Sequence, residues 1–112
     1  MARWAYVNGR FQQLCDPAIC VEDRAFQFSE GVYEVVAITG GRLIDADPHL
    51  DRFARSAAAL KLGAPPATAS LRAVMAEAAR RNRVRDGWIY LQWTGGAAPR
   101  DFAPRARGPG GL

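Results

Sequence analysis

The chain has few of the residues that cross-link small proteins or bind metal ions. Its 112 residues include two cysteines and one histidine. Cys15 and Cys20 lie close together, and only His49 could join them, so a four-ligand zinc site is weakly supported. We expect two reduced cysteines, as in an intracellular protein, and no metal site.

Long apolar runs are also missing. No run approaches the ~20 residues that a helix needs to cross a bilayer. The opening MARWAYVNGRF lacks the charged-then-apolar layout of a signal peptide. We therefore expect a cytoplasmic protein. The hydrophobic fraction of 49% and the charged fraction of 23% are ordinary for a globular chain, and the length is suited to one domain.

Lysine is nearly absent, because Lys61 is the only one, and the net charge of +4 comes from arginine. Basic clusters occur in RRNRVR (80–85) and RARG (105–108). A basic domain can bind nucleic acid, but no RNP-type aromatic motif or zinc-finger spacing accompanies these clusters. We interpret the basic balance mainly as a solvated surface and keep nucleic-acid binding as the last of three hypotheses.

The sequence contains two strong hairpin signals. WAYVNGRFQQL places Asn8-Gly9 between two short strands, and this dipeptide favours the positive φ angles of a type I′ turn. VYEVVAITGGRLI repeats the arrangement around Gly40-Gly41. Both faces of the strand at 32–38 are largely apolar, which is typical of a central strand.

Two helices are predicted after the second hairpin. The first has Asp47 as its N-cap and Pro48 at the first helical position, and the second has Ser70 or Thr68 as its cap. Each has an apolar stripe at helical spacing. The stripes are Leu50, Phe53, Ala57 and Leu60 in the first helix, and Leu71, Val74, Met75, Ala78 and Ala79 in the second.

A later strand, WIYLQWT, completes the pattern. The order predicts an α+β fold: an antiparallel-rich sheet of two hairpins plus the later strand, with two helices packed on one face. Residues 1–95 would form this domain. Residues 96–112 are dense in glycine and proline and lack periodicity, so we predict an interdomain-type loop or an aberrant tail.

Four polar residues are not explained by this framework. Glu34 falls on an apolar strand face, where a buried carboxylate needs a partner. Arg52 lies off the apolar stripe of its helix, Tyr33 stands at a strand entry, and Arg100 lies in a proline-flanked loop. Taken alone, the last three are ordinary surface or half-buried residues.

Four blocks of the sequence change that interpretation: YVNG, EDRAFQFSEGVYEVV, HLDRFARSAAAL and IYLQWTGGAAPRD. In order and spacing they resemble the small N-terminal domain of the fold-type IV (class IV) pyridoxal-phosphate enzymes, and among these most of all the D-amino-acid (D-alanine) aminotransferases. The resemblance covers roughly Trp4 to Arg100. Several separated blocks in the right order are more specific than one short motif.

The resemblance implies a role for each unexplained residue. Arg52 matches the arginine that holds the phosphate of pyridoxal 5'-phosphate, a role suited to a planar, permanently charged fork. Tyr33 matches a tyrosine that lines the substrate pocket, and Arg100 matches the arginine of a carboxylate trap. Glu34 and the Gly31 turn would position these groups. The substrates would be an amino acid and a 2-oxo acid, and the full-length enzyme a homodimer.

The chain also departs from the family pattern. The Schiff-base lysine belongs to a C-terminal domain that we find no match for here, and Lys61 matches no catalytic position. We therefore predict no catalytic residue in this chain. Phe102 replaces a histidine and Gly95 an arginine that the D-amino-acid enzymes often carry, so the substrate chirality stays open. The ending APRARGPGGL suggests a truncated or frame-shifted product.

Three functions follow in order of preference. The first is the N-terminal part of a pyridoxal-phosphate-dependent aminotransferase, inactive by itself. Its substrates would be of the D-alanine type, or those of a branched-chain aminotransferase or an aminodeoxychorismate lyase-like member. The second is a non-catalytic module for dimerisation or anion binding. The third is nucleic-acid binding, which would weaken steeply with salt.

Overall fold

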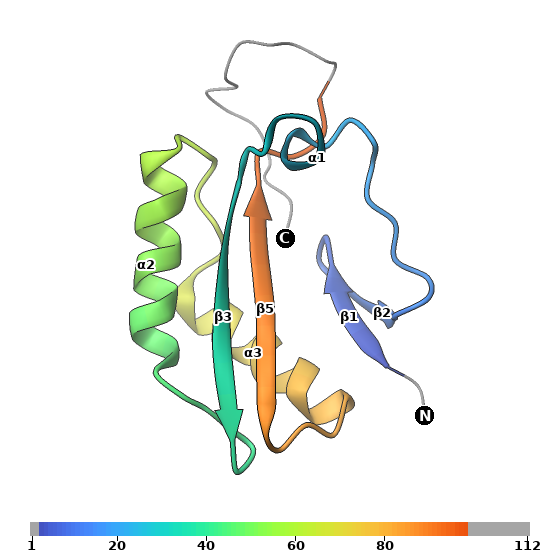
Figure 1. Cartoon of the computed structure of the whole chain (residues 1–112), viewed down its shortest axis with the longest axis vertical. Helices are drawn as coiled ribbons and strands as arrows, with labels where there is room; N and C mark the ends of the chain where they lie inside the picture. Colours follow the sequence, from blue (N-terminus) through green and yellow to red (C-terminus); the bar gives the residue numbers. More distant parts are fainter. Residues whose placement is uncertain (1–2, 99–112) are drawn as a thin grey trace.

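The computed structural model describes residues 3–98 of the chain. Strands and helices are interspersed along the sequence (Figure 1). The elements are β1 (Trp4–Val7), β2 (Arg10–Gln13), α1 (Arg24–Phe28), β3 (Gly31–Thr39), β4 (Arg42–Leu43), α2 (Ala46–Ala59), α3 (Thr68–Arg81) and β5 (Gly87–Thr94). Mixed strands and helices confirm the α+β prediction.

The strands form two antiparallel sheets instead of one. β3 lies between β4 and β5, which confirms it as a central strand, and it pairs with β5 from Gly31↔Thr94 to Ile38↔Gly87. The first hairpin, β1–β2, forms a separate two-stranded sheet. The prediction that both hairpins share one sheet is therefore wrong. β1 instead lies beyond the free edge of β5, with a gap between the two strands in Figure 1.

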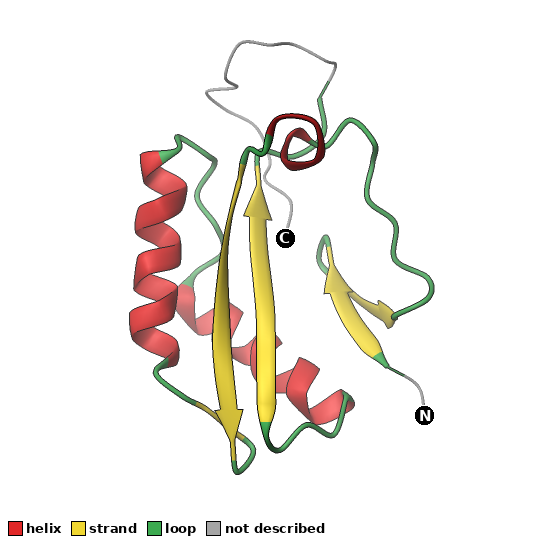
Figure 2. Cartoon of the chain, viewed as in Figure 1, coloured by secondary structure: helices red, strands yellow, loops and turns green. Residues whose placement is uncertain are grey.

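Both long helices pack on the same face of the three-stranded sheet, as predicted (Figure 2). Alternation along β3 points its even-numbered side chains toward them, and Val36 is fully buried. Phe53 and Leu50 of α2 belong to the same buried cluster, at 0% and 1% exposure. The complete buried cluster is Val32, Val36, Leu50, Phe53, Ala57, Leu62, Leu71, Met75, Leu91 and Trp93.

The ends of the helices differ from the prediction. α2 begins at Ala46 with Asp45 as its N-cap, so Asp47 lies in the first turn, where a negative charge suits the helix dipole. At the other end Leu60 is 51% exposed and Leu62 is buried in its place. The chain leaves the helix there, because Lys61 adopts a left-handed conformation with φ 56°.

The second long helix is capped differently as well, and a third helix was missed. α3 follows Ala67, which occupies the N-cap position, so neither Ser70 nor Thr68 is the cap. The short helix α1 is capped by Asp23, whose side chain accepts a hydrogen bond from the N–H of Ala25 at 3.0 Å. Five residues are too few to produce a helical periodicity in the sequence.

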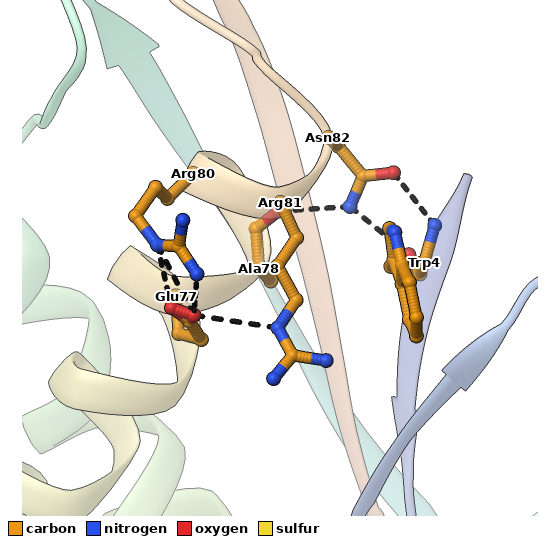
Figure 3. Close-up of polar contacts among 6 residues, drawn as sticks. All are labelled: Trp4, Glu77, Ala78, Arg80, Arg81 and Asn82. Atoms are coloured by element: carbon orange, nitrogen blue, oxygen red, sulfur yellow. Dashed lines mark hydrogen bonds and ion pairs between the residues drawn. The ribbon is translucent and has the colours of Figure 1, made fainter. Parts of the chain in front are cut away.

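The β1–β2 hairpin is attached to the end of α3 (Figure 3). The side-chain amide of Asn82 accepts from the N–H of Trp4 at 2.8 Å and donates to its carbonyl at 3.0 Å. It also donates to the carbonyl of Ala78 at 2.8 Å. The Arg81 guanidinium lies over the rings of Trp4 and Phe11, at 5.0 and 4.4 Å. A side chain thus takes the place of a neighbouring strand along part of β1.

Two sequence features have simple structural outcomes. Cys15 and Cys20 are exposed free thiols. None of the helices within residues 3–98 is both long enough and apolar enough to span a bilayer.

Candidate functional site

The centre of the site is Glu34, a carboxylate on the buried face of β3. Its side chain is 5% exposed, because strand alternation turns it toward α2 together with Val32 and Val36. It accepts hydrogen bonds from two side chains of that helix, Arg52 and His49. The sequence argument that this carboxylate needs a partner is confirmed.

Arg52 binds Glu34 through one edge of its guanidinium. Nε donates to Glu34 Oε2 and Nη2 donates to Oε1, both at 2.7 Å. This bidentate arrangement fixes the plane of the fork. Three further N–H groups remain on Nη1 and Nη2, and the Arg52 side chain is 61% exposed. Within residues 3–98 no acceptor takes them, so the outer edge of the fork is directed to solvent.

His49 completes the support of the carboxylate. Its Nδ1 lies 2.8 Å from Glu34 Oε1 and donates to it, since an ionised carboxylate can only accept. His49 and Arg52 are three residues apart, so both project from the same side of α2. The sequence analysis considered His49 only as a weakly supported zinc ligand, and no motif indicated that it would bind Glu34.

These contacts shift the acid–base behaviour of the pair. The Arg52 hydrogen bond is the main cause that lowers the pKa of Glu34 below its ordinary value, with His49 contributing and burial opposing. The same contact raises the pKa of the Arg52 guanidinium. The site therefore holds an ionised carboxylate and a fully charged guanidinium across the neutral pH range.

Tyr33 lies on the opposite face of β3 from Glu34. Its side chain is 63% exposed and stacks on Tyr90 of β5, with ring centroids 5.3 Å apart and ring planes 10° apart. The neighbouring Trp88 is 78% exposed, so this face of the sheet is open and aromatic. Sequence reasoning did not indicate the partnership with Tyr90, because it depends on strand register.

The two faces meet at an uncovered edge of β3. β4 pairs only with Ile38 and Thr39, so within the described residues the edge of β3 that faces away from β5 has no partner strand beside Tyr33. The structure therefore places Arg52 and Tyr33 on opposite faces of the sheet. The remaining predicted site residue, Arg100, lies outside the described residues.

The segment before residue 99 is held in place by buried polar groups. The Asp23 carboxylate accepts from the Thr94 hydroxyl at 3.1 Å, and the Thr94 oxygen accepts from the N–H of Gly96 at 3.0 Å.

A side chain at Gly31 would approach Ala25 Cβ and the Trp93 carbonyl at 3.3 Å. Close packing beneath α1 therefore leaves little room for a side chain at the glycine that the sequence predicted at a turn.

Comparisons with known proteins agree with this arrangement. The family model for class IV amino-transferases matches residues 31–109. A D-alanine aminotransferase from Bacillus licheniformis is 41% identical over 93 residues, which is 83% of this chain and 33% of that protein. One from Staphylococcus haemolyticus is 33% identical over 98 residues, or 88% of this chain and 35% of that protein. The chain thus spans about a third of these relatives' length.

Solved structures share the fold. The branched-chain amino acid aminotransferase from Escherichia coli superposes with a TM-score of 0.84 at 16% identity, covering 99% of this chain and 39% of that one. A putative 4-amino-4-deoxychorismate lyase from Legionella pneumophila gives 0.76 at 22% identity, covering 83% and 34%. The extent of the family match decides the assignment: this chain belongs to the class IV aminotransferases.

Proposed function

We propose that this chain is the small N-terminal domain of a pyridoxal-phosphate-dependent aminotransferase, and that Arg52 holds the phosphate of the cofactor. The whole enzyme would transfer an amino group between an amino acid and a 2-oxo acid. Residues 1–95 would make up the domain, with 96–112 as the segment that leaves it. The observation that carries the proposal is the Arg52 fork, oriented by Glu34 on one edge and open on the other.

The donor set suits a phosphate. Nη1 and Nη2 offer parallel N–H groups in the spacing that a phosphate accepts bidentately. Glu34 binds Nε and the inner side of Nη2, so it orients the fork without covering the outer edge. Pyridoxal 5'-phosphate, when bound, supplies an electron sink for the substrate's Cα. The residues of this chain would anchor and orient it.

Tyr33 and Arg100 are proposed as substrate-binding residues. Tyr33 presents an exposed ring on the open face of β3, beside the uncovered edge. Arg100 would bind the substrate carboxylate. A D-alanine-type substrate is supported by relatives at 33–41% identity that are named D-alanine aminotransferases. Branched-chain amino acids or an aminodeoxychorismate-type substrate are the alternatives.

This chain is proposed to be catalytically incomplete. Its single lysine, Lys61, is an exposed residue just beyond α2, remote in sequence from β3 and β5. A solvated lysine is a weak nucleophile at neutral pH. We propose that the Schiff-base lysine comes from the C-terminal two thirds of the relatives' length, and that the full-length enzyme is a homodimer. The cytoplasmic location stays a sequence prediction.

The phosphate proposal is tested by binding, without turnover. The purified chain is titrated with pyridoxamine 5'-phosphate, which has no aldehyde to react with Lys61, and the side-chain N–H signals of Arg52 are followed by NMR. We expect these signals to shift. Arg52→Met should weaken binding at least tenfold, whereas Arg55→Met, at an exposed arginine of the same helix, should leave it unchanged.

Two results would contradict the proposal. One is equal affinity of the wild-type and Arg52→Met chains. The other is equal binding of pyridoxamine without its phosphate, which would mean that the ring and not the phosphate is recognised. Incompleteness is tested separately: with pyridoxal 5'-phosphate and D-alanine, pyruvate should stay at the protein-free background. Pyruvate above background that is lost on Lys61→Arg would show that the chain supplies its own lysine.

A further inference from the structure

A basic pocket lies apart from the Arg52 site, at the end of the molecule where the turn between β3 and β4 meets the loop between α3 and β5 (Figure 1). Its volume of about 640 Å³ is within the range of about 300–1,000 Å³ that small-ligand sites have. Aliphatic side chains line it, among them Leu43 and Val84. The other side chains that define it are five exposed arginines: Arg42, Arg72, Arg80, Arg83 and Arg85.

The five arginines come from separate parts of the chain. One lies on β4, two lie on α3, and two lie on the loop that follows α3. Hydrogen bonds hold the turn against this loop. Gly41 N–H donates to the carbonyl of Arg85 at 2.9 Å, and Gly40 N–H donates to the carboxylate of Asp86 at 3.2 Å. The sequence showed only the RRNRVR cluster and indicated a solvated surface, whereas the fold brings the arginine of β4 and a further one of α3 beside that cluster.

Carboxylates neutralise only two of the five arginines. Arg72 forms an ion pair with Asp47 of α2. Arg80 binds Glu77, one helical turn before it, at 2.7 Å (Figure 3). The other three arginines form no ion pair within residues 3–98. Like charges held close together repel one another, so an anion that binds among them is attracted by all three.

Arg83 occupies a backbone position that suits glycine better. It follows the last turn of α3 with φ 55°, and Val84 N–H donates to the carbonyl of Ala79 at 3.0 Å. This is the left-handed position of a Schellman helix end, where glycine is the usual residue. Arg80 and Arg81 already place cations at the negative end of the helix dipole. Neither the backbone nor the dipole therefore requires an arginine at position 83.

We propose that this pocket binds a small ligand that carries a chain of two or more phosphate groups, as a nucleoside triphosphate does. Guanidinium forks bind phosphate oxygens bidentately, and the three arginines without a carboxylate supply several forks for adjacent phosphates. The aliphatic side chains would contact the apolar part of the ligand. A single-stranded nucleic acid fits less well, because no aromatic side chain among the described lining residues can stack on successive bases.

The test uses the full 112-residue chain and ATP as the probe. The side-chain N–H signals of Arg42, Arg83 and Arg85 are followed by NMR during the titration, and we expect all three to shift. Adenosine, which has no phosphate, should shift none of them, and equal shifts with adenosine would contradict the proposal. Arg52→Met should bind ATP as the wild-type chain does. This result separates the pocket from the cofactor site, whether or not Arg52 binds the cofactor.

A matched pair of variants separates binding from folding. Arg83→Gly and Lys61→Gly each remove one exposed cation from a left-handed position after a long helix, at φ 55° and φ 56°. Glycine adopts this conformation readily, so urea unfolding should show that both variants stay folded. Arg83→Gly should weaken ATP binding about tenfold, as the loss of one charge-assisted contact does. Lys61→Gly should leave it unchanged, because Lys61 does not line the pocket.

The proposal is overturned by any of three further results. The first is equal ATP affinity of the Arg83→Gly and Lys61→Gly chains. The second is loss of ATP binding in Arg52→Met, which would mean that ATP occupies the Arg52 site. The third is an affinity that rises steadily from ATP to ten- and twenty-nucleotide single-stranded RNA, which would mean that an extended basic surface follows a nucleic-acid backbone.

Discussion

The attachment of the β1–β2 hairpin through Asn82 gives a prediction whose size follows from the structure. Asn82→Ala removes three neutral hydrogen bonds, two to Trp4 and one to Ala78, at 2.8 to 3.0 Å. Each is worth about 1 kcal/mol net, and water can replace part of this at a half-buried side chain. We expect a loss of about 2 kcal/mol, a substantial share of the stability of a small domain.

The assay combines a global and a local measurement. Urea unfolding followed by circular dichroism gives the free energy of unfolding, and hydrogen exchange gives the protection of the Trp4 amide. Arg80→Met serves as the control, because Arg80 is exposed and its side-chain hydrogen bonds within residues 3–98 go to Glu77 alone. A loss below about 0.5 kcal/mol, together with unchanged exchange at Trp4, would refute the conclusion that Asn82 joins the hairpin to α3.

Three further predictions concern the core and the site. Phe53→Ala, at 0% exposure, should cost about 3–5 kcal/mol in urea unfolding, and a cost below about 1 kcal/mol would mean that the core relaxes around the cavity. Arg52→Met should lower the free energy of unfolding more than Glu34→Met does. Loss of Arg52 leaves the buried Glu34 carboxylate short of hydrogen-bond donors, whereas loss of Glu34 leaves an arginine that water can solvate. A larger loss of stability in Glu34→Met would contradict this. Folding lowers the pKa of Glu34, so its contribution to the free energy of unfolding is complete above the unfolded-state pKa of about 4.3 and is lost as pH falls through the folded-state pKa. Glu34→Met should therefore reduce the fall in the free energy of unfolding between neutral and acidic pH. An unchanged fall would assign the acid destabilisation to other carboxylates.

The sequence was sufficient for the local elements that carry their own signals. Asn8-Gly9 and Gly40-Gly41 specify hairpin turns through positive φ angles, and the structure has them there. Apolar periodicity located both long helices. It did not locate their ends, because Asp45, Ala67 and Lys61 are set by how the chain enters and leaves the core.

The candidate site, too, could be predicted from the sequence only in part. The sequence by itself determined that Glu34 would face an apolar layer and need a partner, and the resemblance singled out Arg52. Only the tertiary structure decided that His49 shares the carboxylate and that Tyr33 stacks on Tyr90. These pairs depend on the docking of α2 and the register of β5, which join residues far apart in the chain.

The separation of the two sheets was beyond any local signal. Hairpin patterns specify how neighbouring strands pair, but not which sheet a finished hairpin joins, since strand edges carry the same backbone groups whatever their sequence. The position of β1 was decided by the contacts of Asn82 and Arg81 with Trp4 at the end of α3. Local sequence thus determined the elements and the chemistry available to them, and long-range packing determined which elements meet.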